Sequence, residues 1–354
     1  MIDPSQDLSL EQAFAELSVA HPGAEVILRP GRKEHVAIVR PAGAPPRAFS
    51  LRHGRLRKLR ATEDAKLPGA ALLADEQALR AILAPHIGAV QRTELVAWRP
   101  GRRAVVRIHG SGRICYLKLL DPGSFGDAAR VFAALGNRGG SLRLALPSMV
   151  DAQHCMHLVD AVQGVALREL VARGIAPWSR VVEAVRELGC IDAQGTGITH
   201  DFATARDAAV RMLDKGIVLE PSLEALRAAV AAVPCGPAPR TGTVHGDLHD
   251  KQVFFGADAA MLIDLESMGH GDPRFDQANL AEHLRLRSLQ QSGVDDGVGA
   301  HVLDQLDFAA GPDRNAFLAV VRARLCGVYA LRPRWKTLVH RLRDETLSLI
   351  ESCR

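Results

Sequence analysis

Aromatic side chains are scarce in this chain of 354 residues: Phe, Trp and Tyr make up 4% of it, against 47% hydrophobic residues overall. The core must therefore be built from Leu, Val, Ile and Ala. The scarcity also argues against nucleic-acid binding, because few rings accompany the basic runs for base stacking. The most basic run, residues 52–60, holds five Lys or Arg and is better explained as a solvated strand face.

Long apolar runs and closely spaced cysteines are also missing. Because no stretch of about 20 apolar residues exists, we expect no membrane-spanning helix. The six cysteines lie far apart in the sequence, which is typical of reduced thiols rather than of disulfides or a structural zinc site. The N-terminus, MIDPSQDLSL, has no apolar core of a signal peptide. We therefore expect a cytoplasmic protein with neither a membrane nor a nucleic-acid partner.

The length and the order of predicted elements indicate two lobes and an extension. At roughly 150 residues per domain, the chain holds about two domains. Residues 1–90 are predicted to contain strands and helices and to form an N-terminal extension or cap. Residues 91–162 are predicted to be mainly strands, and residues 163–354 mainly helices around the hairpin 253–264. The last helix is expected to run over 314–352, and the fold class is α+β.

Two acid-bearing loops stand out in the C-terminal part. The stretch TVHGDLHDKQVFF (243–255) places Asp247 between two strand-like runs, and MLIDLES (261–267) places Asp264 at the end of the next strand. The predicted hairpin brings the two loops together. Phosphoryl transfer to an alcohol needs a carboxylate that orients and deprotonates the hydroxyl, and oxygen ligands for Mg²⁺. Asp247 is thus the candidate base and Asp264 the candidate metal ligand.

The strand-rich part supplies a candidate cation for nucleotide phosphates. Lys118 lies in the apolar strand CYLKLL (115–120), where a buried lysine is costly without an anionic partner. Taken alone it is better explained as an edge-strand lysine, but it follows a hairpin whose turn is RPGRR (99–103). Gly101 would let that turn approach phosphates, and Arg103 adds positive charge.

The tetrapeptide RPGR occurs twice, at residues 29–32 and 99–102. Both copies resemble turns between strands, because Pro-Gly is a strong turn signal. We assign no further meaning to this repetition from the sequence, and no longer repeat is evident.

Together these motifs resemble the aminoglycoside phosphotransferase and choline kinase-like family, which has a protein-kinase-like fold. HGDLHDKQVFF is similar to the family's H-G-D-x-x-x-x-N loop except at its last position, MLIDLES to its I-D-[WFL]-E metal loop, and GDPRFDQANL to the G-D-P-x-x-D-L-A segment. The resemblance covers residues 93–290. It implies a strand-rich N-lobe, a mostly helical C-lobe, and an ATP- and Mg²⁺-dependent phosphotransferase acting on a hydroxyl group of a small molecule.

The resemblance also implies residue roles. Asp247 resembles the catalytic base and Asp264 the Mg²⁺ ligand that bridges the nucleotide phosphates. Lys118 resembles the strand lysine that holds the α- and β-phosphates. Asp272 and Asp276 are expected to organise the loop and cap the following helix rather than to touch substrate.

The connector LVDAVQG (158–164) looks like the hinge of such a fold. The resemblance implies that the backbone of Asp160 and Val162 pairs with adenine, and that Val159 lies behind the base. The sequence leaves the choice between ATP and GTP open, as it does the oligomeric state.

Two positions depart from the family pattern. Gln252 replaces the usual Asn, but it keeps the amide oxygen that a metal would use, and bacterial maltokinases look similar here, with H-G-D-x-H-x-x-Q-V. We therefore expect Gln252 to be a metal ligand. The helix after Lys118 lacks the Glu that kinase-like folds place there, and Asp127 is its only acid. This absence keeps a second hypothesis open: a catalytically weak or inactive nucleotide-binding module.

The acceptor is left open between a sugar, an aminoglycoside and an amino alcohol. The similarity to maltokinases favours a sugar. Four acids, Asp295, Asp296, Asp304 and Asp307, could attract a cationic substrate from the helical lobe. A solvated helix face explains them equally well, and we favour that interpretation.

Overall fold

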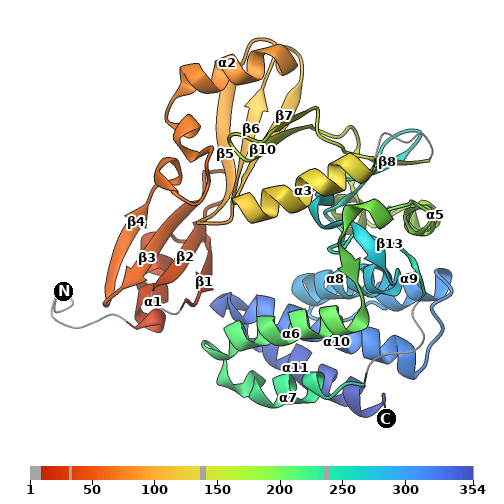
Figure 1. Cartoon of the computed structure of the whole chain (residues 1–354). Coiled ribbons are helices and arrows are strands. Elements are labelled where there is room, and N and C mark those ends of the chain that lie inside the picture. The colour runs from red at the N-terminus through yellow and green to blue at the C-terminus, as the bar shows by residue number, and fades with distance from the viewer. Residues whose placement is uncertain (1–8, 32–33, 136–140, 235–239, 354) are drawn as a thin grey trace. The chain divides into compact units, whose positions relative to one another are not determined.

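A computed structural model describes residues 9–31, 34–135, 141–234 and 240–353 (Figure 1). The chain divides into two compact units. Unit 1 comprises residues 1–126, 147–161 and 331–333, and unit 2 comprises residues 127–146, 162–330 and 334–354. Helix α3 (Pro122–Leu135) runs from the first unit into the second. The expected three-part division, with boundaries near residues 90 and 162, stays a prediction.

Unit 1 is built on two antiparallel sheets. The first contains β1 (Glu25–Arg29), β2 (His35–Arg40), β3 (Arg47–Arg52) and β4 (Arg55–Leu59), paired in chain order. The second contains β5 (Arg92–Arg99), β6 (Arg103–His109), β7 (Ile114–Leu120), β10 (Met156–Asp160) and β9 (Met149–Asp151), in that spatial order. The helices of unit 1 are α1 (Leu10–Ala20) and α2 (Glu76–Ile87), with short 3₁₀ segments at Ala61–Glu63 and Ala70–Leu73.

The second sheet has one face that packs into a hydrophobic core. Alternate residues of β6 and β7, including Val106 and Leu117, form a core with Leu83 of α2. Figure 1 shows α2 beside these strands. Because side chains alternate, the opposite face carries Lys118 and Arg103. Lys118 is only 8% exposed, so most of this residue is removed from solvent.

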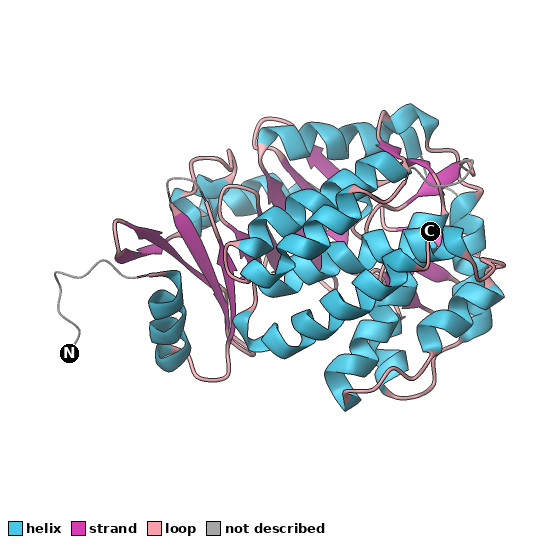
Figure 2. Cartoon of the chain, turned by 90° about the horizontal axis from the view of Figure 1, so that it is seen from below, coloured by secondary structure: helices cyan, strands magenta, loops and turns pink. Residues whose placement is uncertain are grey.

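Unit 2 is mostly helical (Figure 2). Its helices are α4 (Leu167–Ala172), α5 (Trp178–Gly189), α6 (Phe202–Ile217), α7 (Glu224–Ala231), α8 (Arg274–Ser292), α9 (Val298–Gln305), α10 (Pro312–Ala330) and α11 (Lys336–Glu351). Its short strands are β8 (Leu142–Leu144), β11 (Val165–Ala166), β12 (Thr199–His200), β13 (Gly242–Val244), β14 (Val253–Phe255), β15 (Ala260–Leu262) and β16 (Gly269–Gly271), and 3₁₀ turns lie at Gln194–Thr196, Pro221–Leu223 and Leu265–Ser267. A further 3₁₀ turn, Pro333–Trp335, begins at the last residue of unit 1 and continues into unit 2.

The expected lobes, one strand-rich and one helical, are confirmed. The single helix expected over 314–352 is wrong, because α10 ends at Ala330 and α11 begins at Lys336. Pro333 lies in the break, and a proline inside a helix removes a backbone donor and clashes with the preceding turn. Within the described ranges, no helix is long and apolar enough to cross a membrane.

Helix α8 is buried although its sequence is polar. Its Glu282 carboxylate accepts two hydrogen bonds from Arg322 of α10, at 2.7 and 2.9 Å. Its Arg287 donates to the fully buried carboxylate of Asp250, at 2.9 Å. Buried charges are tolerated when they are paired and hydrogen-bonded in this way. These pairs fix α8 against α10 and against the loop that holds Asp247.

Candidate active site

The loop around Asp247 is held by the start of α8. Both carboxylate oxygens of the buried Asp276 accept backbone N–H groups, one from His245 and one from Gly246 at 3.1 Å. The buried His245 ring donates from Nε2 to the carbonyl of Ile263, at 2.9 Å. Asp272 accepts from Arg274 N–H and pairs with its guanidinium group. The expected organising roles of both aspartates therefore have direct structural support.

Two further contacts fix the path of the loop. The side-chain amide of Asn279 in α8 donates to the carbonyl of Leu248, at 2.7 Å. Gly246 has a positive φ of +82°, and a Cβ there would lie 2.6 Å from the His200 ring. Only glycine fits this turn without strain, so the backbone conformation explains why the second residue of the H-G-D motif is glycine.

The two predicted metal ligands lie side by side. Gln252 Nε2 donates to Asp264 Oδ2 at 3.2 Å, and the backbone N–H of Ile263 donates to the Gln252 carbonyl at 3.1 Å. Asp264 has a φ of +59°, a left-handed conformation that is uncommon outside glycine and typical of functional turns. The hairpin β14–β15 thus brings together two oxygen-bearing side chains that are twelve positions apart.

Asp247 itself pairs with an arginine that the sequence did not reveal. Arg324 of α10 donates from Nη2 to Asp247 Oδ1 at 2.7 Å and from Nη1 to Asn279 Oδ1 at 3.2 Å. The Asp247 side chain is 40% exposed, so it is accessible from solvent. Burial of the group raises the Asp247 pKa, but the charges of Arg324 and, at acid pH, of His249 outweigh this effect and lower the pKa to about 2. Asp247 is therefore a carboxylate at neutral pH.

Two histidines complete the surroundings of Asp247. His249 Nε2 lies 4.0 Å from Asp247 Oδ2, and the ring centroids of His249 and His283 are 4.7 Å apart. Burial lowers the pKa of His249, with partial compensation from Asp247, and burial lowers the pKa of His283 further. Both rings are therefore neutral at pH 7, and Arg324 is the cation in direct contact with Asp247 among the described residues.

Arg324→Gln is expected to move the pH profile of turnover. In the parent protein the depressed Asp247 pKa keeps the carboxylate ionised down to about pH 2. Without Arg324, burial raises this pKa, so an acid limb should appear in kcat/KM between about pH 4 and 6. The stability from this pair is present above the unfolded pKa of about 3.9 and is lost as pH falls towards 2.

The measurement is kcat/KM from pH 4 to 8 for the parent and for Arg324→Gln. Arg211→Gln, at an exposed position of α6, is the matched control and should keep the parent profile. If the pH profile of Arg324→Gln matches that of the parent, with no acid limb between about pH 4 and 6, the electrostatic role of this arginine is contradicted.

The β5–β6 turn in unit 1 is braced by the segment before α2. The backbone N–H of Gly101 donates to Asp64 Oδ2 at 2.7 Å, and Trp98 Nε1 donates to the same oxygen at 3.0 Å. Gly101 has a φ of +68°, and a Cβ there would lie 3.0 Å from Lys66 Cδ. The conformation of the turn thus explains the glycine at position 101 without any role in phosphate binding. A pocket of about 460 Å³ beside the turn is lined by Lys66, Arg102 and Asp121, among others.

Strand β10 presents part of the predicted hinge. The N–H of Ala161 donates to the carbonyl of Ile114 of β7, at 2.9 Å. Because antiparallel pairs alternate, the backbone groups of Asp160 point away from β7. On that other side β9 pairs only as far as Leu158, so the backbone of Asp160 lies beyond the paired edge. Val159 precedes it on β10, and Val162 belongs to unit 2.

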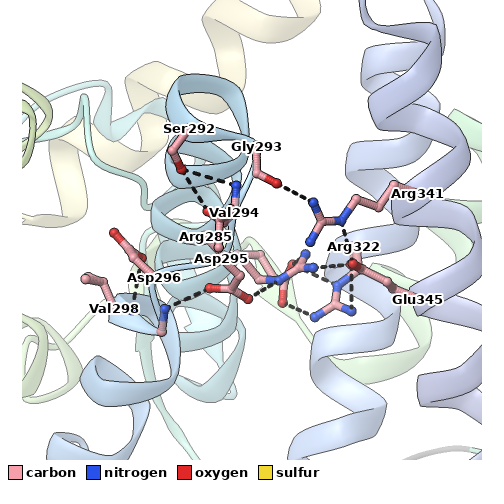
Figure 3. Close-up of polar contacts among 12 residues, drawn as sticks. Arg285, Ser292, Gly293, Val294, Asp295, Asp296, Val298, Arg322, Arg341 and Glu345 are labelled. Atoms are coloured by element: carbon pink, nitrogen blue, oxygen red, sulfur yellow. Dashed lines mark hydrogen bonds and ion pairs between the residues drawn. The ribbon is translucent and has the colours of Figure 1, made fainter.

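The remaining predicted groups have structural partners. Asp127 of α3 pairs with Arg130, three residues further along the helix. The four acids near α9 all accept hydrogen bonds within unit 2: Asp295 from Arg285, Asp296 from the backbone of Val298, Asp304 from Arg314 and Asp307 from Arg186. Figure 3 shows Asp295 and Asp296 in this network. These pairs favour a structural role for the acids over attraction of a cationic substrate.

The family model described as the phosphotransferase enzyme family matches residues 100–317, which is more than half of the chain. The chain belongs to the phosphotransferase enzyme family. It is accordingly a phosphotransferase. The matched range contains the Asp247 loop, the Asp264 turn and Lys118, whereas Arg324 lies beyond its end.

Solved structures of other phosphotransferases share the fold. The apo form of a thermostable mutant of aminoglycoside phosphotransferase APH(4)-Ia is 14% identical, with 77% of this chain and 98% of that chain covered and a TM-score of 0.55. Choline kinase LicA from Streptococcus pneumoniae is 10% identical, with 79% and 99% covered and a TM-score of 0.52. At such identities the likeness shows the fold alone. No curated protein matches the sequence.

Proposed function

We propose that this phosphotransferase transfers the γ-phosphoryl group of ATP to a hydroxyl group of a small molecule, with Mg²⁺ as cofactor and Asp247 as the base. The observation that carries the proposal is the arrangement of unit 2, in which one loop and one hairpin hold an ionised carboxylate, Asp247, and two neighbouring oxygen-bearing side chains, Gln252 and Asp264. Such a site matches the needs of phosphoryl transfer to an alcohol. A thermostable mutant of APH(4)-Ia, which shares the fold, was crystallised in a ternary complex with AMP-PNP and hygromycin B.

The metal roles of Asp264 and Gln252 are supported by the chemistry of the donor set. Mg²⁺ is usually bound by one or two protein oxygen ligands and completes its shell with water and substrate phosphates. The Asp264 carboxylate lies 3.2 Å from the Gln252 amide, so one residue offers a charged oxygen and the other a neutral one. Mg²⁺ bound there would neutralise charge on the nucleotide phosphates.

Unit 1 is proposed to hold the nucleotide. Lys118, on the face of the second sheet that also carries Arg103, would contact the α- and β-phosphates. Gly101 and Arg103 would place the β5–β6 turn near the phosphates. The backbone of Asp160 and Val162 would pair with adenine, with Val159 behind the base. The position of the Asp160 backbone beyond the paired edge of β10 supports this assignment.

The ionised state of Asp247 determines how it would act. Its carboxylate accepts a hydrogen bond from the acceptor hydroxyl and orients the oxygen towards the γ-phosphorus. As the oxygen–phosphorus bond forms and ADP leaves, the hydroxyl proton passes to Asp247. A carboxylate with a pKa of about 2 is a weak base, but a loose transition state requires proton transfer only late. Positioning is therefore the larger part of its contribution.

A neutral acceptor, such as a sugar, fits the charges near Asp247 better than a polycationic aminoglycoside. Arg324 contacts the proposed base directly, and a nearby cation on the acceptor would be repelled. Of the four acids near α9, Asp295, Asp304 and Asp307 are paired with arginines of unit 2, and Asp296 accepts a backbone N–H group. Both observations concern residues of unit 2, and both argue against an acidic pocket that would bind a cationic acceptor.

An acceptor screen tests the proposal. Purified protein with ATP and Mg²⁺ is assayed for ADP release against panels of sugars, aminoglycosides and amino alcohols. We expect turnover with at least one sugar and stronger turnover than with any cationic acceptor. ATP binding without turnover on the whole panel would instead favour the catalytically inactive nucleotide-binding module.

A further inference from the structure

Unit 1 gathers five arginines from separate segments. Arg29 and Arg40 come from β1 and β2, Arg99 and Arg103 face each other across the β5–β6 pair, and Arg332 lies in the short segment after α10. That segment joins β1 through a hydrogen bond from the N–H of Leu28 to the carbonyl of Leu331, at 2.8 Å. Figure 1 shows β1, β2 and β5 in the same part of the molecule.

The acids near these arginines do not balance their charge. Glu25 lies 3.7 Å from Arg40 and 3.1 Å from Arg332. Among the described residues, no acid forms an ion pair with Arg29, Arg99 or Arg103. The Nε atoms of these three arginines are buried without a hydrogen-bond partner in the described parts of the chain. Buried donors of this kind are rare in folded proteins and indicate a missing partner.

The electrostatic cost of the arrangement is visible in two arginine pKa values. Burial, followed by the charges of Arg332, Arg40 and Arg103, lowers the pKa of Arg29 to about 10. Burial, followed by the charge of Arg103, lowers the pKa of Arg99 to about 9. Both values lie above neutral pH, so the guanidinium groups stay charged. Several like charges in a desolvated place are costly unless an anion offsets them.

We propose that Arg29, Arg40, Arg99 and Arg103 form a binding site for a phosphate-bearing polyanion. Guanidinium groups bind phosphate through paired N–H donors in a fixed fork, which suits this ligand better than a point charge. A ligand with more than one negative charge matches the number of arginines. The strands β1 and β2 contribute directly to this site, which gives the N-terminal extension a binding role.

Two sources could supply this chemistry. Arg99 and Arg103 flank the β5–β6 turn, and Arg103 lies on the same sheet face as Lys118. The ligand is therefore either the phosphate chain of the nucleotide or a phosphate group carried by a different molecule. The proposal concerns binding only, and it holds whether or not Asp247 supports turnover.

The test uses inorganic tripolyphosphate as the probe and the full chain in the absence of Mg²⁺, so that the Asp264 turn does not contribute. Binding is measured by titration calorimetry for the parent, Arg29→Gln, Arg99→Gln and the control Arg57→Gln, an exposed arginine of β4. We expect each of the first two variants to weaken binding about tenfold or more, as expected for the loss of a charge-assisted hydrogen bond. Arg57→Gln should bind like the parent.

Competition identifies the source. If the nucleotide phosphates are the ligand, ATP displaces tripolyphosphate, and Arg29→Gln weakens ATP binding but leaves adenosine binding unchanged. If a separate anion is the ligand, ATP and tripolyphosphate bind together. Equal tripolyphosphate affinity in the parent and in both folded variants, as judged by thermal unfolding, or no binding to the parent, would overturn the proposal. Neither of these outcomes depends on turnover, so both would leave the proposed function unaffected.

Discussion

Asp247→Asn is expected to lower kcat by about 10² to 10⁴ while leaving the affinity for ATP unchanged. The variant keeps the size and shape of the side chain but can no longer take the acceptor proton or orient the hydroxyl as a charged acceptor. The nucleotide contacts proposed for unit 1 do not involve this side chain. The measurement is ADP release with the best acceptor from the screen, alongside ATP binding by calorimetry.

The matched control for this change is Asp258→Asn, at an exposed position in the turn between β14 and β15. It should retain the parent kcat. Because Asp247→Asn also leaves Arg324 without its ionic partner, the double variant with Arg324→Gln separates the two effects. Parent-like turnover in Asp247→Asn would remove this residue from the catalytic role.

The local motifs of the site could be predicted from the sequence because each acts within a short segment. The H-G-D loop needs a glycine with positive φ, an aspartate in a short loop and a hairpin directly after it. The Asp264 turn follows the apolar strand β15. In both cases residues that are near in sequence determine the geometry.

Arg324 could not be predicted, because it is 77 positions from Asp247 and has no motif around it. Only the packing of α10 on α8 brings it to the loop, through pairs such as Arg322 with Glu282. The prediction of one helix over 314–352 also hid the break between α10 and α11. That break places Arg332 in unit 1.

The arginine site had one sequence signal whose meaning the sequence could not supply. Arg29 and Arg99 are the first residues of the two RPGR tetrapeptides. The sequence predicts a turn at each copy, but nothing in the pattern says that Arg29 and Arg99 belong to one compact unit. Their shared environment depends on the packing of two separate sheets.

Asp264→Asn is expected to reduce kcat about 100-fold or more and to raise the Mg²⁺ concentration needed for half-maximal activity. Asn has nearly the same size and tolerates the left-handed conformation observed at this position, so the backbone should not change. What is lost is the negative charge that attracts a hard cation. The measurement is a Mg²⁺ titration of ADP release at saturating ATP, with Asp258→Asn as the control.

Gln252→Asn gives the graded comparison within the same titration. Both residues carry an amide oxygen, and the change only shortens the side chain by one methylene group. If Gln252 is a metal ligand, the Mg²⁺ requirement should shift modestly, and far less than in Asp264→Asn. The Gln252 amide lies 3.2 Å from the Asp264 carboxylate. With the shorter Asn side chain, the loop would have to move towards Asp264 to restore this distance. A Mg²⁺ titration identical to the parent, or a complete loss of Mg²⁺ dependence, would contradict a ligand role for Gln252. A modest shift would support the view that this loop remains functional with Gln in place of Asn.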